Sequence, residues 1–225
     1  MAEAWGNYYP IVDIDGPAFG TVPGEFTPGL YVKQGVTFTS RGCNNHCPWC
    51  LVPKREGRLR ELALSNGHII NDNNFLQCSR DHRLAVYWML DQQKERATFS
   101  GGLQPNLVTD EIAAEFRDIR IEDVFLAADT EAALAPLERA IARLQFLGRE
   151  RTRCYTLIAF GDETIKQAER RLKAVWELGA MPHAQLYQPA DRYVRYSQEW
   201  RALARTWSRP AAMKAEMRGV DHDRR

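Results

Sequence analysis

The sequence predicts an α/β fold in which parallel strands alternate with helices. Six short segments that resemble strands begin 26 to 32 residues apart, which is the spacing that successive strand–helix units require. Amphipathic segments lie between them, with apolar residues every three or four positions, the period of a helix. Since parallel strands need crossover connections and helices cover their sheets, an α/β architecture follows.

The expected strands cover residues 36–40, 68–71, 97–100, 123–127, 153–159 and 183–187. Apolar alternation supports the first of them, Val36 to Ser40, which ends in Arg41-Gly42. A loop follows it, and the connection from this loop to the second strand is expected to be short. Polar or glycine-containing turns follow the remaining strands.

Helices are expected at residues 84–93, 110–116, 134–147 and 164–175. Apolar residues recur at helical spacing in the third helix, while its charged residues are left for solvent. Thr164 and Gln167 form a capping-box start for the fourth helix. Gly148 and Gly179 are expected to end the third and fourth helices.

Composition fits one large domain that can bury a full core, since the chain has 225 residues of which 44% are hydrophobic. The net charge of +1 favours neither nucleic acid nor an anionic membrane as a partner, although a local basic patch leaves nucleic acid open. The sequence has no apolar run of about 18 residues and no signal-peptide pattern. An odd, clustered set of cysteines also suits a reducing compartment. We therefore expect a soluble cytoplasmic protein without a membrane partner.

Three closely spaced cysteines, Cys43, Cys47 and Cys50, follow the first strand in a Cys-x-x-x-Cys-x-x-Cys pattern. Thiolates this close together indicate a metal site. Iron–sulfur clusters usually have four cysteine ligands, so three suggest a cluster with one open iron. Zinc is the competing metal, with His46 or Cys78 as its fourth ligand. From the cysteine spacing alone, both metals stay open.

The segment from Thr37 to Pro53, followed by Glu56-Gly57, resembles the cluster loop of the radical S-adenosylmethionine (radical SAM) superfamily. The resemblance implies that Cys43, Cys47 and Cys50 bind a [4Fe-4S] cluster whose fourth iron binds S-adenosylmethionine. It also implies that Trp49, next to the third cysteine, packs near the adenine. The implied fold is a partial (β/α)6 barrel. On this basis residues 35–208 form the core, residues 1–34 an irregular Gly/Pro-rich cover, and residues 209–225 a frayed tail.

Ligands of α/β proteins bind at the carboxyl ends of the strands, so the next two strand ends are candidate cofactor contacts. Asp72 and Asn73 follow the second strand, where the superfamily contacts the amino group of the cofactor, often through Gly-Gly-Glu. This chain departs from that pattern, and an Asp-Asn run is also an ordinary turn. Gly101 and Gly102 follow the third strand and are expected either to let the backbone approach the cofactor or to form a tight turn.

Two further strand ends complete the expected cofactor site. Asp129 follows the fourth strand, where the superfamily places a ribose-binding residue. Either Asp129 or Thr130 is also expected to cap the next helix. Gly161 follows the fifth strand and resembles the glycine-containing turn near the adenine.

The resemblance implies an enzyme that cleaves S-adenosylmethionine reductively to methionine and a 5′-deoxyadenosyl radical, which then abstracts hydrogen from a substrate that the sequence does not identify. No catalytic acid or base is assigned. An external electron donor such as flavodoxin or ferredoxin is an expected partner. The alternative is a zinc- or cluster-binding interaction module without catalysis. Cys78 and Cys154 are expected to be buried as small apolar side chains.

Overall fold

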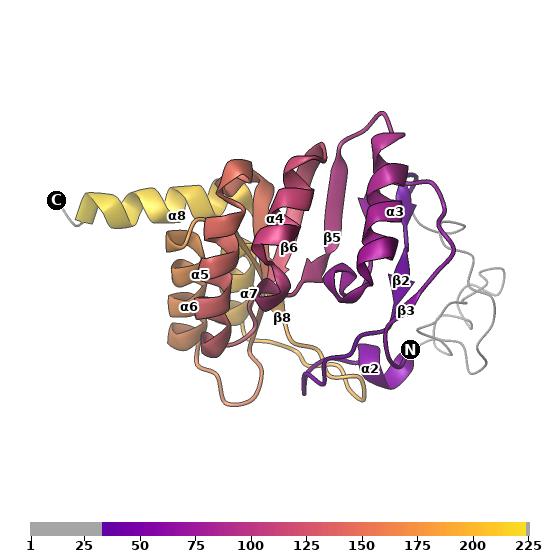
Figure 1. The fold of residues 1–225 in the computed structure, drawn as a ribbon. Coiled ribbons are helices and arrows are strands. Elements are labelled where there is room, and N and C mark those ends of the chain that lie inside the picture. Colours follow the sequence, from indigo (N-terminus) through magenta and orange to yellow (C-terminus); the bar gives the residue numbers. More distant parts are fainter. Residues whose placement is uncertain (1–32, 224–225) are drawn as a thin grey trace.

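The computed structural model describes residues 33–223, with side chains to residue 218. Its centre is a six-stranded parallel sheet with the order β1-β4-β5-β6-β7-β8 (Figure 1). The strands are β1 (Val36–Thr37), β4 (Ile69–Ile70), β5 (Ala97–Leu103), β6 (Ile121–Ala127), β7 (Thr152–Ile158) and β8 (Met181–Leu186). The predicted α/β class is therefore confirmed. The expected N-terminal cover lies almost entirely outside the described residues.

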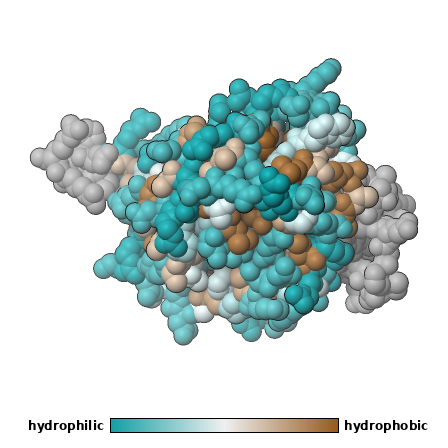
Figure 2. Space-filling view, viewed as in Figure 1, coloured by the Kyte–Doolittle hydropathy of each residue, from teal (hydrophilic) through white to brown (hydrophobic). Residues whose placement is uncertain are grey.

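Strand order in the sheet equals strand order in the chain. Crossovers between parallel strands are right-handed, so successive crossovers in one direction place their helices on the same face of the sheet. Figure 1 shows these helices along one side. They are α3 (Arg80–Asp91), α4 (Asp110–Arg117), α5 (Leu134–Arg143) and α6 (Ile165–Glu177). In Figure 2 this helix-covered side is mainly hydrophilic, with apolar residues visible in smaller patches.

Side-chain caps fix where the helices begin. Ser79 accepts a hydrogen bond from the His82 amide, so α3 starts earlier than the residue 84 expected from periodicity. The predicted capping box of Thr164 and Gln167 is present. Gly148 and Gly179 have φ angles of 70° and 103° and follow α5 and α6, as predicted.

The first crossover, from β1 to β4, contains a second, smaller sheet, and the only helix in the part of it that follows Cys50 has four residues. The predicted strand 36–40 is divided, because after β1 the chain leaves the main sheet to form β2 (Ser40–Arg41). Strand β2 pairs antiparallel with β3 (Arg60–Glu61), and the four-residue helix α2 (Val52–Arg55) lies between them in the chain. This ribbon forms the two stems of the cysteine loop, which we define as residues 42–51.

The core fills the space between the sheet and its helices. Phe99 of β5 is fully buried and stacks on Phe116 of α4, with 4.9 Å between ring centroids. Phe75 packs against Phe99 from the segment after β4. Full burial of such side chains stabilises the fold by roughly 1.5–3 kcal/mol each.

The C-terminal segment corrects the expectation of a frayed tail over residues 209–225. It forms α8 (Pro210–Asp223), which follows α7 (Gln198–Trp207). Met213 is 2% exposed and belongs to the same apolar cluster as the buried Trp207. Met217, one turn later, packs against this cluster too, so apolar contacts hold the helix in place. No helix among residues 33–223 combines the length and apolar character needed to cross a bilayer.

Strand β5 is longer than predicted, because Gly101 and Gly102 lie inside it rather than after it. A Cβ atom on Gly101 would lie 1.6 Å from the backbone oxygen of Asp72. The register with β6 shifts between Phe99 and Leu103, and the Tyr155 hydroxyl donates to the Ser100 carbonyl at 3.0 Å. The close approach that was expected toward a cofactor is therefore made toward the chain just after β4.

We predict that Gly101→Ala is strongly destabilising, because the added methyl group meets backbone that cannot move away cheaply. We expect the free energy of unfolding to fall by about 3 kcal/mol or more in urea denaturation. Gly102→Ala is the matched control, since its Cβ would lie 3.3 Å from the Ala127 Cβ. Equal losses for the two variants would contradict this account.

Candidate metal and cofactor site

The cysteine loop begins at Gly42, where the two stems come so close together that a larger residue would not fit. Gly42 has a φ of 82°, and a Cβ atom there would lie 2.2 Å from the Arg58 carbonyl oxygen. The adjacent Cys43 amide donates to the Gly57 carbonyl at 3.1 Å. Backbone contact therefore closes the base of the loop directly beside its first cysteine.

Asp72 anchors the segment that leads into the loop. One carboxylate oxygen accepts from the Thr39 amide at 2.7 Å, and the other accepts from the hydroxyls of Thr39 at 2.6 Å and Ser40 at 2.8 Å. Asp72 is only 2% exposed. Burial raises the pKa of this carboxyl, and these hydrogen bonds oppose the rise. Because three of about four acceptor positions of the carboxylate are used here, Asp72 supports the segment that leads into the loop.

Asn73 and Glu56 hold the first residue of the loop. The Gly42 amide donates to Asn73 Oδ1 at 3.0 Å and to Glu56 Oε2 at 3.3 Å. Glu56 also forms an ion pair with Arg41 at 2.8 Å. The structure thus places Asn73 at the start of the cysteine loop, where its side chain accepts a hydrogen bond from backbone.

A cluster of four amide side chains holds the part of the loop between Cys43 and Cys47. At its centre, Gln104 Oε1 accepts from Asn45 at 2.8 Å, from Asn74 at 3.0 Å and from Gln77 at 3.3 Å. Gln77 in turn accepts from the Asn44 amide at 2.8 Å. Gln104 and Gln77 were not predicted as site residues from the sequence. The only available signal was the position of Gln104 just after the two glycines of the third expected strand.

The three loop thiols lie close enough to affect one another. Burial raises the pKa of Cys47, and the charges of Cys50, Asp129 and Cys43 raise it further. Burial also raises the pKa of Cys50, whereas the Val52 backbone amide lowers it. Within the described part of the chain, however, no three His, Cys, Asp or Glu side chains are grouped tightly enough to hold a metal ion.

Asp129, just past β6, faces the cysteine loop. Its carboxylate accepts from the Leu157 amide at 2.9 Å, so it bridges the ends of β6 and β7. Burial raises its pKa, while the Leu157 amide and the Trp49 side chain lower it. Thr130 occupies the cap position of the next helical turn without a side-chain cap bond, whereas the Asp129 carboxylate bonds to the Leu157 amide and to the Trp49 side chain. The structure therefore brings Asp129 and Trp49 together, as the expected nucleoside site requires.

Three aromatic rings connect the cysteine loop to the ends of the last two strands. Trp49 meets Phe160 edge-on at 5.4 Å between centroids, and Phe160 meets Tyr187 at 4.9 Å. The neighbouring Gly161 has a φ of 62°, and a Cβ atom there would touch nothing within 4 Å. Gly161 thus forms a turn, while Phe160, which the sequence analysis did not select, makes the contact with the loop.

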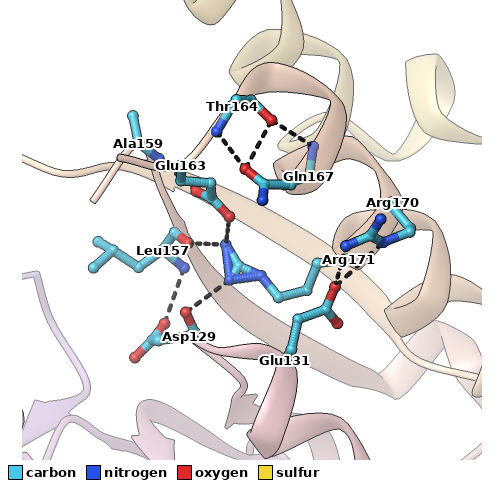
Figure 3. Close-up of polar contacts among 9 residues, drawn as sticks. All are labelled: Asp129, Glu131, Leu157, Ala159, Glu163, Thr164, Gln167, Arg170 and Arg171. Atoms are coloured by element: carbon cyan, nitrogen blue, oxygen red, sulfur yellow. Dashed lines mark hydrogen bonds and ion pairs between the residues drawn. The ribbon is translucent and has the colours of Figure 1, made fainter. Parts of the chain in front are cut away.

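Arg171 of α6 is a buried cation that fixes the ends of β6 and β7 (Figure 3). It donates to the carbonyls of Asp129 at 2.7 Å and Leu157 at 2.6 Å, and it pairs with Glu163 at 2.6 Å. The other Glu163 oxygen accepts from the amide of Ala159 at 2.8 Å. These contacts hold the backbone that precedes Phe160.

Ala159 has a φ of 63°, an unusual value for a residue with a side chain. Such strain persists only where the surroundings impose it, and here Glu163 accepts from the Ala159 amide. A cavity of about 300 Å³ lies beside this segment, with Asp129, Phe160 and Arg171 in its lining. The strained turn thus lies at the carboxyl ends of the parallel strands, as the cysteine loop does.

The face of the sheet opposite the helices carries partly exposed polar and aromatic side chains. Arg153 pairs with Asp123 at 3.1 Å, with exposed side-chain fractions of 29% and 22%. Phe125 stacks on Tyr155 at 4.8 Å, and Tyr155 meets His183 at 5.6 Å. These side chains form a polar surface on β6, β7 and β8, whose carboxyl ends lie on the same side as the cysteine loop.

Comparison with known proteins does not extend this description, since no protein-family model and no curated protein matches the chain.

We predict that Asp72→Ala lowers the free energy of unfolding by about 3 kcal/mol or more, because each buried donor left without an acceptor costs roughly 1–3 kcal/mol. Three donors from Thr39 and Ser40 lose their partner. Urea denaturation gives the measurement, and the exposed Asp162→Ala is the control, with an expected change within about 0.5 kcal/mol. A loss at Asp72 no larger than at Asp162 would show that the loop has another anchor.

Two adjacent arginines of α6 give a second, internally controlled prediction. Arg171→Met should lower the free energy of unfolding by about 3–5 kcal/mol, because it leaves the buried Glu163 carboxylate unpaired. Arg170→Met removes an exposed ion pair with Glu131 and should cost no more than about 1 kcal/mol. Chemical denaturation of both variants tests the difference, and similar losses would refute the role assigned to Arg171.

Proposed function

We propose that this protein is a radical SAM enzyme that binds a [4Fe-4S] cluster through Cys43, Cys47 and Cys50, and S-adenosylmethionine at the open iron. The observation that carries the proposal is the Cys-x-x-x-Cys-x-x-Cys loop, which leaves the first strand of a parallel sheet wound in one direction. Sequential winding with helices on one face is compatible with the partial (β/α)6 barrel that the sequence resemblance implies.

The three thiols fit such a cluster by their chemistry and by their place in the fold. All three are free cysteines on one loop, and the pKa of Cys47 responds to both of the others. A cluster would require the loop to draw the sulfurs inward, since they form no closed metal-binding group. The two stems would hold the ends of the cysteine loop, and the amide cluster would hold Asn44 and Asn45, while the sulfurs move.

A zinc site with Cys78 as its fourth ligand is poorly supported. A structural zinc site takes four ligands, and Cys78 was one of the two candidates for the fourth. Cys78 is 4% exposed, and burial raises the pKa of its thiol to about 12, which disfavours the thiolate that a metal needs. The Cys78 thiol has the Ser40 hydroxyl as its hydrogen-bond partner. Cys78 therefore lies beside the contact between Ser40 and Asp72, and not in the cysteine loop.

When bound, the cluster would supply the electron that breaks a carbon–sulfur bond of S-adenosylmethionine, giving methionine and a 5′-deoxyadenosyl radical. The described residues then have positioning roles. Asp129 would accept hydrogen bonds from ribose hydroxyls through the capacity that Leu157 leaves free. Trp49 and Phe160 would offer ring surfaces to the adenine.

The opposite face of the sheet is the proposed side for the substrate. Arg153, Tyr155 and His183 are only partly buried there, so they are accessible to a molecule placed below the cysteine loop. Burial and the charge of Arg153 lower the pKa of His183, which favours its neutral form. An external electron donor and a reducing cytoplasmic setting are part of the proposal. No acid or base is needed for hydrogen-atom abstraction.

We predict that Cys47→Ala abolishes both the brown colour and the formation of 5′-deoxyadenosine. The protein is reconstituted anaerobically with iron and sulfide, mixed with dithionite and S-adenosylmethionine, and its products are separated by chromatography. The variant keeps only two of the three thiolates that we propose as cluster ligands, which is too few to hold the cluster stably.

Cys78→Ala is the matched control, because it removes a buried thiol that we place outside the site. It should retain colour and product. Product formation by Cys47→Ala would refute the ligand assignment, and zinc uptake in preference to iron by the unmodified protein would refute the proposed function.

A further inference from the structure

A concentrated positive charge follows the cysteine loop. We define the basic segment as residues 54–60, which contain Lys54, Arg55, Arg58 and Arg60 together with one acidic residue, Glu56. Its net charge is thus +3, whereas the whole chain has a net charge of +1. The rest of the chain is therefore slightly negative, and this segment stands out from it.

The positive charges of the basic segment are not neutralised locally. Lys54, Arg55 and Arg58 are exposed and form no ion pair among the described residues. The only acidic residue of the segment, Glu56, turns its carboxylate inward to Arg41 and the Gly42 amide, and its side chain is 9% exposed. Within the described part of the chain, the segment therefore presents Lys54, Arg55 and Arg58 to solvent without an ion pair.

The basic segment lies beside the third cysteine. Lys54 and Arg55 form the last turn of α2, which begins two residues after Cys50. Lys54 and Arg55 thus lie four and five residues after Cys50 in the chain, so the exposed cations are near the place where an electron must enter.

We infer that the basic segment is the docking surface for a small acidic electron-transfer protein of the flavodoxin or ferredoxin type. The inference rests on the proposed function. At this surface one electron would leave the donor, which is oxidised, and reach the cluster, which is reduced; no atom is transferred. Complementary charge speeds such encounters and orients the partner.

Nucleic acid is the competing anionic partner, and the segment fits it less well. Proteins that bind single strands combine a positive groove with aromatic side chains on which bases stack. Residues 54–60 contain no aromatic residue. The large exposed apolar side chains of the described residues are all elsewhere, namely Leu64, Leu84, Trp88, Phe146 and Tyr193.

The test compares two triple variants with the same change in charge. Lys54→Glu, Arg55→Glu and Arg58→Glu together reverse the basic segment. Arg139→Glu, Lys166→Glu and Arg205→Glu together reverse three exposed cations on α5, α6 and α7. Both reconstituted proteins are mixed anaerobically with reduced flavodoxin, and cluster reduction is followed by absorbance at low and high salt. Production of 5′-deoxyadenosine with dithionite is measured in parallel.

We expect reversal of the basic segment to slow reduction by flavodoxin at least tenfold at low salt and to remove most of its salt dependence. The control triple variant should stay within threefold of the unmodified protein. Dithionite, a small reductant that needs no docking surface, should support equal product in all three proteins.

Equal flavodoxin rates in the two triple variants would overturn the inference. So would selective loss of binding to a fluorescent single-stranded oligonucleotide with flavodoxin kinetics unchanged, which would assign the surface to nucleic acid. Absence of product with dithionite in the unmodified protein would instead defeat the proposed function, so the two failures are distinguishable.

Discussion

The buried carboxylate of Asp72 is the interaction on which the candidate site depends. It lies just after β4 and receives three hydrogen bonds from the chain that continues β1 toward the cysteine loop. Gly101 lets β5 approach the backbone of the same residue. Three neighbouring strands are therefore fixed relative to one another at a single point, and the start of the loop has little freedom to shift.

A second buried charge performs the same task on the other side of the site. Arg171 joins the carbonyls that follow β6 and lie near the end of β7, while Glu163 completes its pairing. Both anchors satisfy backbone groups at strand ends, where the sheet ladder no longer supplies partners. The opposite signs of Asp72 and Arg171 follow from the groups they serve: free N–H and O–H donors in one case and free carbonyls in the other.

The sequence allowed the strands of the main sheet and helices α3 to α6 to be predicted, because these depend on local periodicity, and Thr164 with Gln167 shows that a helix start can be recognised as well. It also placed Asp72, Asn73 and Asp129 at strand ends. It did not predict α7 or the small sheet of β2 and β3. It did not reveal that Thr39 and Ser40 donate hydrogen bonds to Asp72, because these residues lie 33 and 32 positions before Asp72 in the chain. Gln104 and Arg171 were missed for the same reason. The C-terminal helix was missed because its stability comes from packing on Trp207.

The strands at the two edges of the main sheet are β1 and β8. The cysteine loop follows β1, and ring contacts from Trp49 to Phe160 and from Phe160 to Tyr187 connect it to the end of β8. Ring contacts tolerate sliding far better than a strand ladder does, since they lack the strict direction of a hydrogen bond. The two edge strands of the main sheet are therefore linked at this end through side chains, without backbone pairing between them.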